Sequence, residues 1–205
     1  MTQIEKNNEN ELEELLIKNL PATMKAGNNK KYSNIYEMKT KVAINKCKFI
    51  NFNSKDRISF MIFDIDEYNG KEAKEHFKDI DGLLDFITDK IGYEPTYILE
   101  TNKGFHFAYH LKNHIYTYQT KALKYLTDIK RRMIELLHCD EIASNRNSGV
   151  FRNPLLHTHY YSYQINYELN DFKDLIPKRI TKDRVRTNGI NTSDDEIVEG
   201  QRNKT

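Results

Sequence analysis

The sequence has no tryptophan, only two cysteines and no long apolar run. The two cysteines, Cys47 and Cys139, provide neither a disulfide framework nor a metal-type spacing, which favours a reducing compartment. No stretch is long enough to span a bilayer, and the polar N-terminus does not have the pattern of a signal peptide. We therefore expect a soluble, cytoplasmic protein without a membrane partner.

Net charge is also nearly absent, because 32 Lys and Arg residues stand against 30 Asp and Glu residues. Contacts with nucleic acid would therefore have to come from local basic patches. The 205 residues fit one domain, and the low apolar content of 38% indicates solvated tails around it. Tyrosine (13) and phenylalanine (10) are abundant; both residue types fill β-sheets, and both can stack on bases.

The most informative stretch is residues 60–67 (FMIFDIDE), an apolar run that ends in acids. Such a run is typical of a strand buried on both faces. Because side chains alternate along a strand, Asp64 and Asp66 are expected on one side and Ile65 on the other. Two neighbouring carboxylates repel each other, and a divalent cation between them would relieve the repulsion. The alternative is a strand that simply runs into a polar turn at residues 66–70.

Periodicity predicts an α+β fold, with a mixed or antiparallel sheet and helices mainly on one face. The predicted helices are 11–20, 71–90 (with a break near 81–82), 118–138 and 169–176. The predicted strands are 44–51, 57–64, 96–100, 105–111 and 149–154, followed by a Tyr-rich extended segment from 157. Residues 26–31 are predicted as a loop and 32–41 as a short helical or irregular segment. Two hairpins are expected, one turning at 53–56 and one at 101–104.

The strand at 105–111 alternates in character, with His106, Ala108 and His110 on the side opposite its large apolar residues. We expect His106 on the open face of the sheet, near the acid pair, although a lone strand histidine commonly has no ligand. Asp140 follows the longest helix, where the negative end of the helix dipole disfavours an acid. A bound cation would explain it, and an ordinary acid at a helix end is the alternative.

The order Asp64-x-Asp66, then Gly104-x-His106, then Asp140 resembles the three motifs of the archaeo-eukaryotic primase superfamily. The likeness is to the replicase-type primase-polymerases of bacterial plasmids and mobile elements, and it covers about residues 42–165. Residues 48–53 and 149–154 also look like these replicases. The family often has serine where Gly104 stands, so only a backbone N–H remains there. Glu141, adjacent to Asp140, is an alternative third acid.

The resemblance implies an RRM-like catalytic core with an N-terminal α/β extension, and template-dependent nucleotidyl transfer by a primase-polymerase. It implies two Mg²⁺ or Mn²⁺ ions, which can activate a 3′-hydroxyl and stabilise the attacking and leaving oxygens. Implied partners are a single-stranded DNA template and nucleoside triphosphates. The implied roles are catalysis and metal binding for Asp64, Asp66 and Asp140, nucleotide binding for Lys103, Gly104, His106 and Arg152, and template binding for Arg146.

Four segments are expected along the chain. Residues 1–41 form an N-terminal helical extension, 42–177 the catalytic domain and 178–195 a basic and polar linker. Residues 196–205 resemble the start of the small helical module that follows many of these catalytic domains. The natural protein is thus expected to continue past Thr205, and a replicative helicase or origin DNA is expected to bind through that region.

Two alternatives belong to other classes. A nicking replication initiator would use His157 and His159 as metal ligands and Tyr160 or Tyr161 as the nucleophile. Its signature has a bulky apolar residue between the histidines, whereas Thr158 stands here. A non-catalytic origin-binding domain would need a recognition helix with a basic face, and the sequence has no recognisable one.

Overall fold

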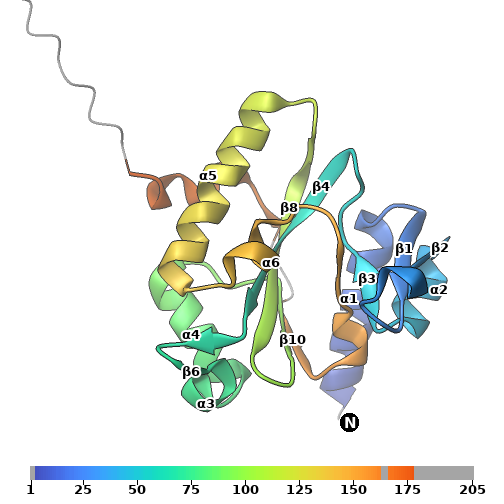
Figure 1. The fold of residues 1–205 in the computed structure, drawn as a ribbon, viewed down its shortest axis with the longest axis horizontal. Helices are drawn as coiled ribbons and strands as arrows, with labels where there is room; N and C mark the ends of the chain where they lie inside the picture. The colour runs from blue at the N-terminus through green and yellow to red at the C-terminus, as the bar shows by residue number, and fades with distance from the viewer. Residues whose placement is uncertain (1–2, 163–165, 178–205) are drawn as a thin grey trace, which may run out of the picture.

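In a computed structural model, which describes residues 3–162 and 166–177, the chain forms two sheets with helices outside them (Figure 1). The five-stranded sheet has the order β10-β7-β8-β11, and β4 pairs with the opposite edge of β8. All its pairings are antiparallel except the parallel pairing of β11 with β8. Its strands are β4 (Arg57–Ile65), β7 (Tyr97–Glu100), β8 (Phe105–Tyr116), β10 (His159–Tyr161) and β11 (Asn166–Tyr167).

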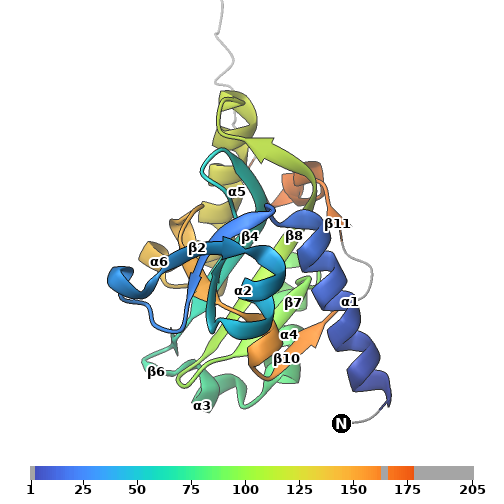
Figure 2. The same cartoon turned by 90° about the vertical axis from the view of Figure 1, so that its right-hand side faces the viewer.

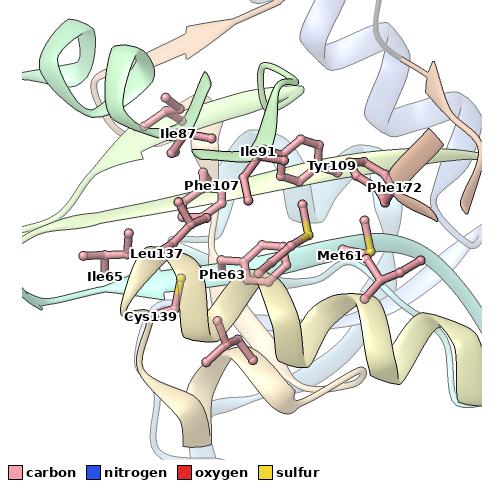
Figure 3. Packing of buried hydrophobic residues seen from close by; sticks show 14 of the residues in the cluster. Met61, Phe63, Ile65, Ile87, Ile91, Phe107, Tyr109, Leu137, Cys139 and Phe172 are labelled. Atoms are coloured by element: carbon pink, nitrogen blue, oxygen red, sulfur yellow. The ribbon is translucent and has the colours of Figure 1, made fainter. Parts of the chain in front are cut away.

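One face of the five-stranded sheet packs against helices α4 and α5 and the 3-10 helix η3 (Figure 3). The side chains of α5 that recur at three and four residues are buried there, as predicted: Leu126, Ile129, Met133 and Leu137. The alternation along β8 is also confirmed, since Phe105, Phe107 and Tyr109 lie on this face. The helices of this part are α3 (Ala73–Phe77), α4 (Ile80–Ile91), α5 (Thr120–Leu137), α6 (Glu141–Asn145) and η3 (Leu169–Leu175).

The other face of the five-stranded sheet is covered by a second sheet, of order β2-β1-β3-β9, and by helices α1 and α2 (Figure 2). A second core, with Leu12, Leu16, Ile50, Phe60 and Ala108, joins the two parts. Its elements are α1 (Gln3–Asn19), β1 (Thr23–Gly27), η1 (Tyr32–Asn34), β2 (Tyr36–Lys39), α2 (Thr40–Lys46), β3 (Phe49–Asn51), β9 (Val150–Arg152) and η2 (Pro154–Leu156). A small hairpin, β5 (Glu67–Tyr68) with β6 (Lys71–Glu72), follows β4.

The face that the sequence predicted to be open is therefore buried. His106 and His110 are each 3% exposed, because the second sheet packs over the side of β8 on which they lie. The hairpin predicted from strands 44–51 and 57–64 is also wrong. Residues 40–46 form helix α2, and β3 pairs with β1 and β9, whereas β4 pairs with β8.

Other boundaries differ in detail. The helix predicted for 71–90 is two helices, which part at Lys78 (φ +69°), after which Asp79 caps α4 by accepting from the Gly82 N–H. Residues 26–31, predicted as a loop, begin within β1. Residue 41, the predicted end of the N-terminal extension, lies inside α2. The four-stranded sheet contains strands from both sides of this residue. The predicted linker and C-terminal module lie outside the described residues.

Of the helices that the structure describes, none combines the length and the apolar character that a membrane crossing requires.

Candidate active site

Asp64 and His106 face each other near the end of the paired strands β4 and β8. They are cross-strand partners, and Nε2 of His106 lies 3.1 Å from Oδ2 of Asp64. Both residues are buried, at 8% and 3% exposed. Ile65, between the two acids, lies in the helix-side core as the alternation predicts, and Asp66 is exposed just beyond the strand end. The fold thus brings Asp64 and His106 together, and Asp66 lies two residues further along the chain.

The two carboxylates have opposite pKa shifts. Burial opposes the ionisation of Asp64, but the hydrogen bond and charge of His106, with Lys30 and Arg152, outweigh it and lower the pKa of Asp64. Partial removal from water, and then the neighbouring charge of Asp64, raise the pKa of Asp66. Two acids that repel each other in this way are a chemical environment that favours a cation.

The free edge of β4 is closed by the segment between α5 and α6. The backbone N–H of Asp140 donates to the Asp64 carbonyl at 2.8 Å, and the Asp64 N–H donates to the Ser144 hydroxyl at 3.1 Å. The Asp140 backbone is therefore beside Asp64, on the same strand edge. Its carboxylate, however, caps α6 by accepting from the Ala143 N–H at 2.6 Å.

This cap corrects the dipole argument made for Asp140. Helix α5 ends at Leu137, and Asp140 begins α6, where the positive end of a helix favours an acid. Among residues 3–162 and 166–177, no group of three or more His, Cys, Asp or Glu side chains is arranged to hold a metal ion. The cap uses Oδ1 of Asp140 alone, so Asp140 as a third metal ligand stays a prediction.

Positive charge reaches the acid pair from the second sheet. Arg152 on β9 stacks on the Phe49 ring, with its guanidinium 5.6 Å from the centroid, and Lys30 lies over the same ring at 5.8 Å. Arg152 and Lys30 both act on the charges of Asp64 and Asp66. Sequence reasoning missed Lys30, because it stands in a polar loop 34 residues before Asp64 with no motif around it.

Arg146 lies over the ring of Phe151, 5.7 Å from its centroid, and the same ring meets His106 edge-on at 6.3 Å. Arg146 is exposed, and its backbone carbonyl accepts from the buried ammonium of Lys130 at 3.1 Å. Lys130 also donates to Oδ1 of Asn147, and burial lowers the pKa of Lys130 to about 8. The loop that carries Arg146 is thereby fixed to helix α5.

Asn53 makes the matching connection on the other side of this loop. Its side-chain amide donates to the carbonyls of Asn147 and Phe60, and its Oδ1 accepts from the N–H groups of Ser59 and Phe60. The side chain is 3% exposed. Asn53, two residues after the end of β3, therefore links strand β4 to the loop before β9.

The predicted nucleotide ligands of the β7–β8 turn have other partners. The Gly104 N–H donates to the Thr101 hydroxyl at 3.0 Å, so the predicted use of this amide for phosphate is revised. A Cβ at Gly104 would lie 1.8 Å from the Ile65 carbonyl oxygen, so glycine is needed where the two backbones approach. Lys103 is exposed and lies 3.8 Å from Glu72, an ion pair weak enough to exchange for another anion.

Three buried polar atoms at the site have no hydrogen-bond partner among the described residues: Oδ1 of Asp64, Nδ1 of His106 and Nε of Arg152. Unpaired buried groups of this kind are costly in a finished core and point to a ligand. The carboxylate oxygen suits a hard cation such as Mg²⁺ or Mn²⁺, which commonly binds one or two carboxylates plus substrate phosphates. Nε of Arg152 can donate to a phosphate oxygen, and Nδ1 of His106 can do so when the imidazole is protonated.

The residues of the nicking alternative do not assemble in this way. Nδ1 of His157 and Nδ1 of His159 lie within hydrogen-bond distance of the carbonyls of Asn153 and His157, at 2.8 and 3.0 Å. The Tyr160 hydroxyl donates to Glu94 at 3.2 Å, and Tyr161 is buried in the core beneath the second sheet. The two tyrosines therefore point to opposite faces, away from a shared site.

Comparison with known proteins agrees with this architecture. The sequence model of the Replicase family matches residues 19–176, and the chain belongs to this family. Its structure is similar to the archaeo-eukaryotic primase (AEP) domain of the primase-polymerase (PrimPol) of cyanophage S-2L, with a TM-score of 0.54 and 12% identity. The match covers 84% of this chain and 98% of that one. No curated protein matches the sequence. The predicted α+β fold and the predicted likeness to replicases are thus confirmed.

Proposed function

We propose that this domain is a DNA primase-polymerase, a template-dependent nucleotidyltransferase that starts or extends a strand in the replication of a plasmid or mobile element. The observation that carries the proposal is the buried Asp64–His106 pair, with Asp66 beside it and the cations of a second sheet over it. Membership of the Replicase family and the primase-polymerase fold support the same reaction class.

Asp64 and Asp66 would hold Mg²⁺ or Mn²⁺, and Asp140 stays a predicted third ligand. When bound, such ions lower the pKa of an attacking hydroxyl and stabilise charge on the phosphates. The raised pKa of Asp66 beside Asp64 and the unpaired Oδ1 of Asp64 support this role. The amide of Asp140 keeps the Asp64 backbone in place whether or not its carboxylate joins the site.

Arg152 and His106 would bind the triphosphate of the incoming nucleotide. Arg152 presents a planar guanidinium that can pair with two phosphate oxygens, and its Nε is unpartnered. His106, held by Asp64 through Nε2, has Nδ1 left for a phosphate oxygen. The triphosphate would thus lie between the two sheets, with its charge offset from both sides.

The proposal is tested by incubating the chain with single-stranded DNA, Mg²⁺ or Mn²⁺ and labelled nucleotides, with ribo- and deoxynucleotides in separate reactions. We expect labelled products with at least one nucleotide type and none after removal of the metal with EDTA. Absence of product under all conditions, with binding to duplex origin DNA retained, would instead favour the non-catalytic origin-binding alternative. Association with a helicase is proposed for the region past the described residues.

A further inference from the structure

A groove of about 560 Å³ lies along the second sheet. Strands β1 and β2, the residues after β3, and the start of β9 form its walls. Its volume is in the range of ligand sites, roughly 300–1,000 Å³. Lys30 lines this groove, and its charge also acts on Asp64 and Asp66; Val150, two residues before Arg152 on β9, lines it as well.

The charge of the groove suits a polyanion. Lys25, Lys30 and Lys55 line it, all exposed, against one acid, Glu37. Glu37 is the cross-strand neighbour of Lys25 and accepts a hydrogen bond from the Thr23 hydroxyl. Within residues 3–162 and 166–177, neither Lys30 nor Lys55 forms an ion pair with a carboxylate. Two lysine charges are therefore available along the groove without breaking a salt bridge.

The lining between the lysines combines apolar and amide groups. Met24, Ile35 and Val150 provide apolar surface, and Asn51 and Ser148 provide hydrogen-bonding groups. This combination suits a base set against the apolar wall with phosphates at the lysines. A small inorganic anion would use the lysines alone and leave the apolar wall exposed.

An exposed aromatic pair stands at the Lys55 end of the groove. Tyr116 and Tyr118 stack with their ring centroids 5.4 Å apart, and their side chains are 38% and 75% exposed. The intervening Thr117 donates its backbone N–H to the carbonyl of Asp56, the residue after Lys55. In Figure 1 this turn between β8 and α5 lies next to the start of β4. Exposed tyrosine rings are platforms on which unpaired bases stack.

We propose that the groove of Lys30 and Lys55, continued by Tyr116 and Tyr118, binds single-stranded nucleic acid and leads it to the acid pair. That the strand runs toward Asp64 rests on the proposed function, but binding of the strand to the groove does not require catalysis. Phosphates pair with the lysines, and a base stacks on Tyr118. The binding is sequence-independent, because charge and ring faces carry it.

The test is fluorescence anisotropy with a labelled oligothymidylate of about 12 nucleotides, within the site sizes of roughly 4–16 nucleotides of the OB-folds that bind single strands. EDTA is present and nucleotide is absent, so that only strand binding is measured. We expect Lys55→Ala to weaken binding about five-fold and to reduce the slope of log affinity against log salt by about 0.7, the value for one phosphate contact on a single strand.

Matched variants separate the two contributions. Tyr118→Ala is expected to weaken binding about ten-fold with little change in salt slope, whereas Tyr118→Phe keeps the ring and binds as wild type. Lys121→Ala and Lys124→Ala, which remove equal charge from the exposed surface of α5, leave the affinity unchanged. All substituted side chains are exposed, and circular dichroism verifies that each variant is folded.

Wild-type oligonucleotide binding by both Lys55→Ala and Tyr118→Ala would overturn the proposal, as would equal weakening by Lys121→Ala. Weakened binding of free nucleoside triphosphate without any effect on the oligonucleotide would also overturn it. Strand synthesis by Asp64→Asn separates failure of the groove assignment from failure of the proposed function. If groove variants lose strand binding while Asp64→Asn retains strand synthesis, the groove assignment stands and the catalytic one falls.

Discussion

The five-stranded sheet carries the carboxylates and the imidazole of the candidate active site, whereas the cations come from the four-stranded sheet and the loop after β1. Asp64 and His106 are buried on strands paired over a long register. Lys30 is exposed and Arg152 half-buried, and both rest on the ring of Phe49. Under the proposed function this difference separates two tasks: the acids would define the reacting centre, and the cations would bind substrate charge without entering the core.

The largest effect is expected on the acidic side. Asp64→Asn keeps the shape of the side chain and removes its charge, so nucleotide incorporation should fall by about 10³-fold, near 4 kcal/mol of transition-state stabilisation. Steady-state incorporation assays measure it, with Asp128→Asn, a half-buried acid paired with Arg131 on α5, as the control. Retention of activity within about ten-fold would remove Asp64 from the reacting centre.

The second effect concerns the buried lysine that joins α5 to the Arg146 loop. The folded pKa of Lys130 is about 8, against about 10.4 in the unfolded chain, so the unfolded state holds more protons between these values. Stability should therefore rise with pH across this window, by about 3 kcal/mol in all.

Lys130→Met should lose this rise, because methionine does not titrate. Urea unfolding of the wild type and of Lys130→Met from pH 7.5 to 10.5 gives the free energy of unfolding of each. The contributions of the tyrosines cancel when the two curves are subtracted. Parallel curves for the two proteins would show that the ammonium is not desolvated, and the fixed position of the loop would then need another explanation.

The third effect concerns the amide that joins β4 to the same loop. Asn53→Ala removes four hydrogen bonds and leaves buried backbone groups unpaired, so the free energy of unfolding should fall by about 3 kcal/mol. Asn45→Ala, at an exposed site where the amide donates to Glu13 and to the Lys41 carbonyl, should change it by less than about 0.5 kcal/mol. Equal losses in the two variants would mean that Asn53 does not hold the two sheets together.

The smallest effect is expected on the cationic side. Arg152→Ala should raise the KM for nucleotide about ten-fold, or 1.4 kcal/mol, with little change in kcat, since the lost contact is with phosphate in both ground and transition states. Arg131→Ala on α5 is the control. A fall in kcat with unchanged KM would place Arg152 at the reacting centre and weaken the division of tasks between the sheets.

Sequence reasoning predicted the part of the site that lies on regular, strongly patterned strands. The apolar run before Asp64 and the alternation after Gly104 were sufficient to bring Asp64 and His106 together. Long helices such as α5 were predicted for the same reason. The second sheet was not predicted, because its strands are three to five residues long and β3 pairs with β9, about 100 residues away. Without that sheet, Lys30 had no visible relation to the acids.

The close approach of Gly104 to the Ile65 carbonyl has a consequence for protein engineering and for comparison among relatives. Any side chain at residue 104 requires a different backbone path through Ile65 and Asp66, so these positions should change together rather than singly. A serine grafted into this turn would alter where Asp66 stands before it offered a hydroxyl. Variants of the turn are best exchanged as a unit with the end of β4.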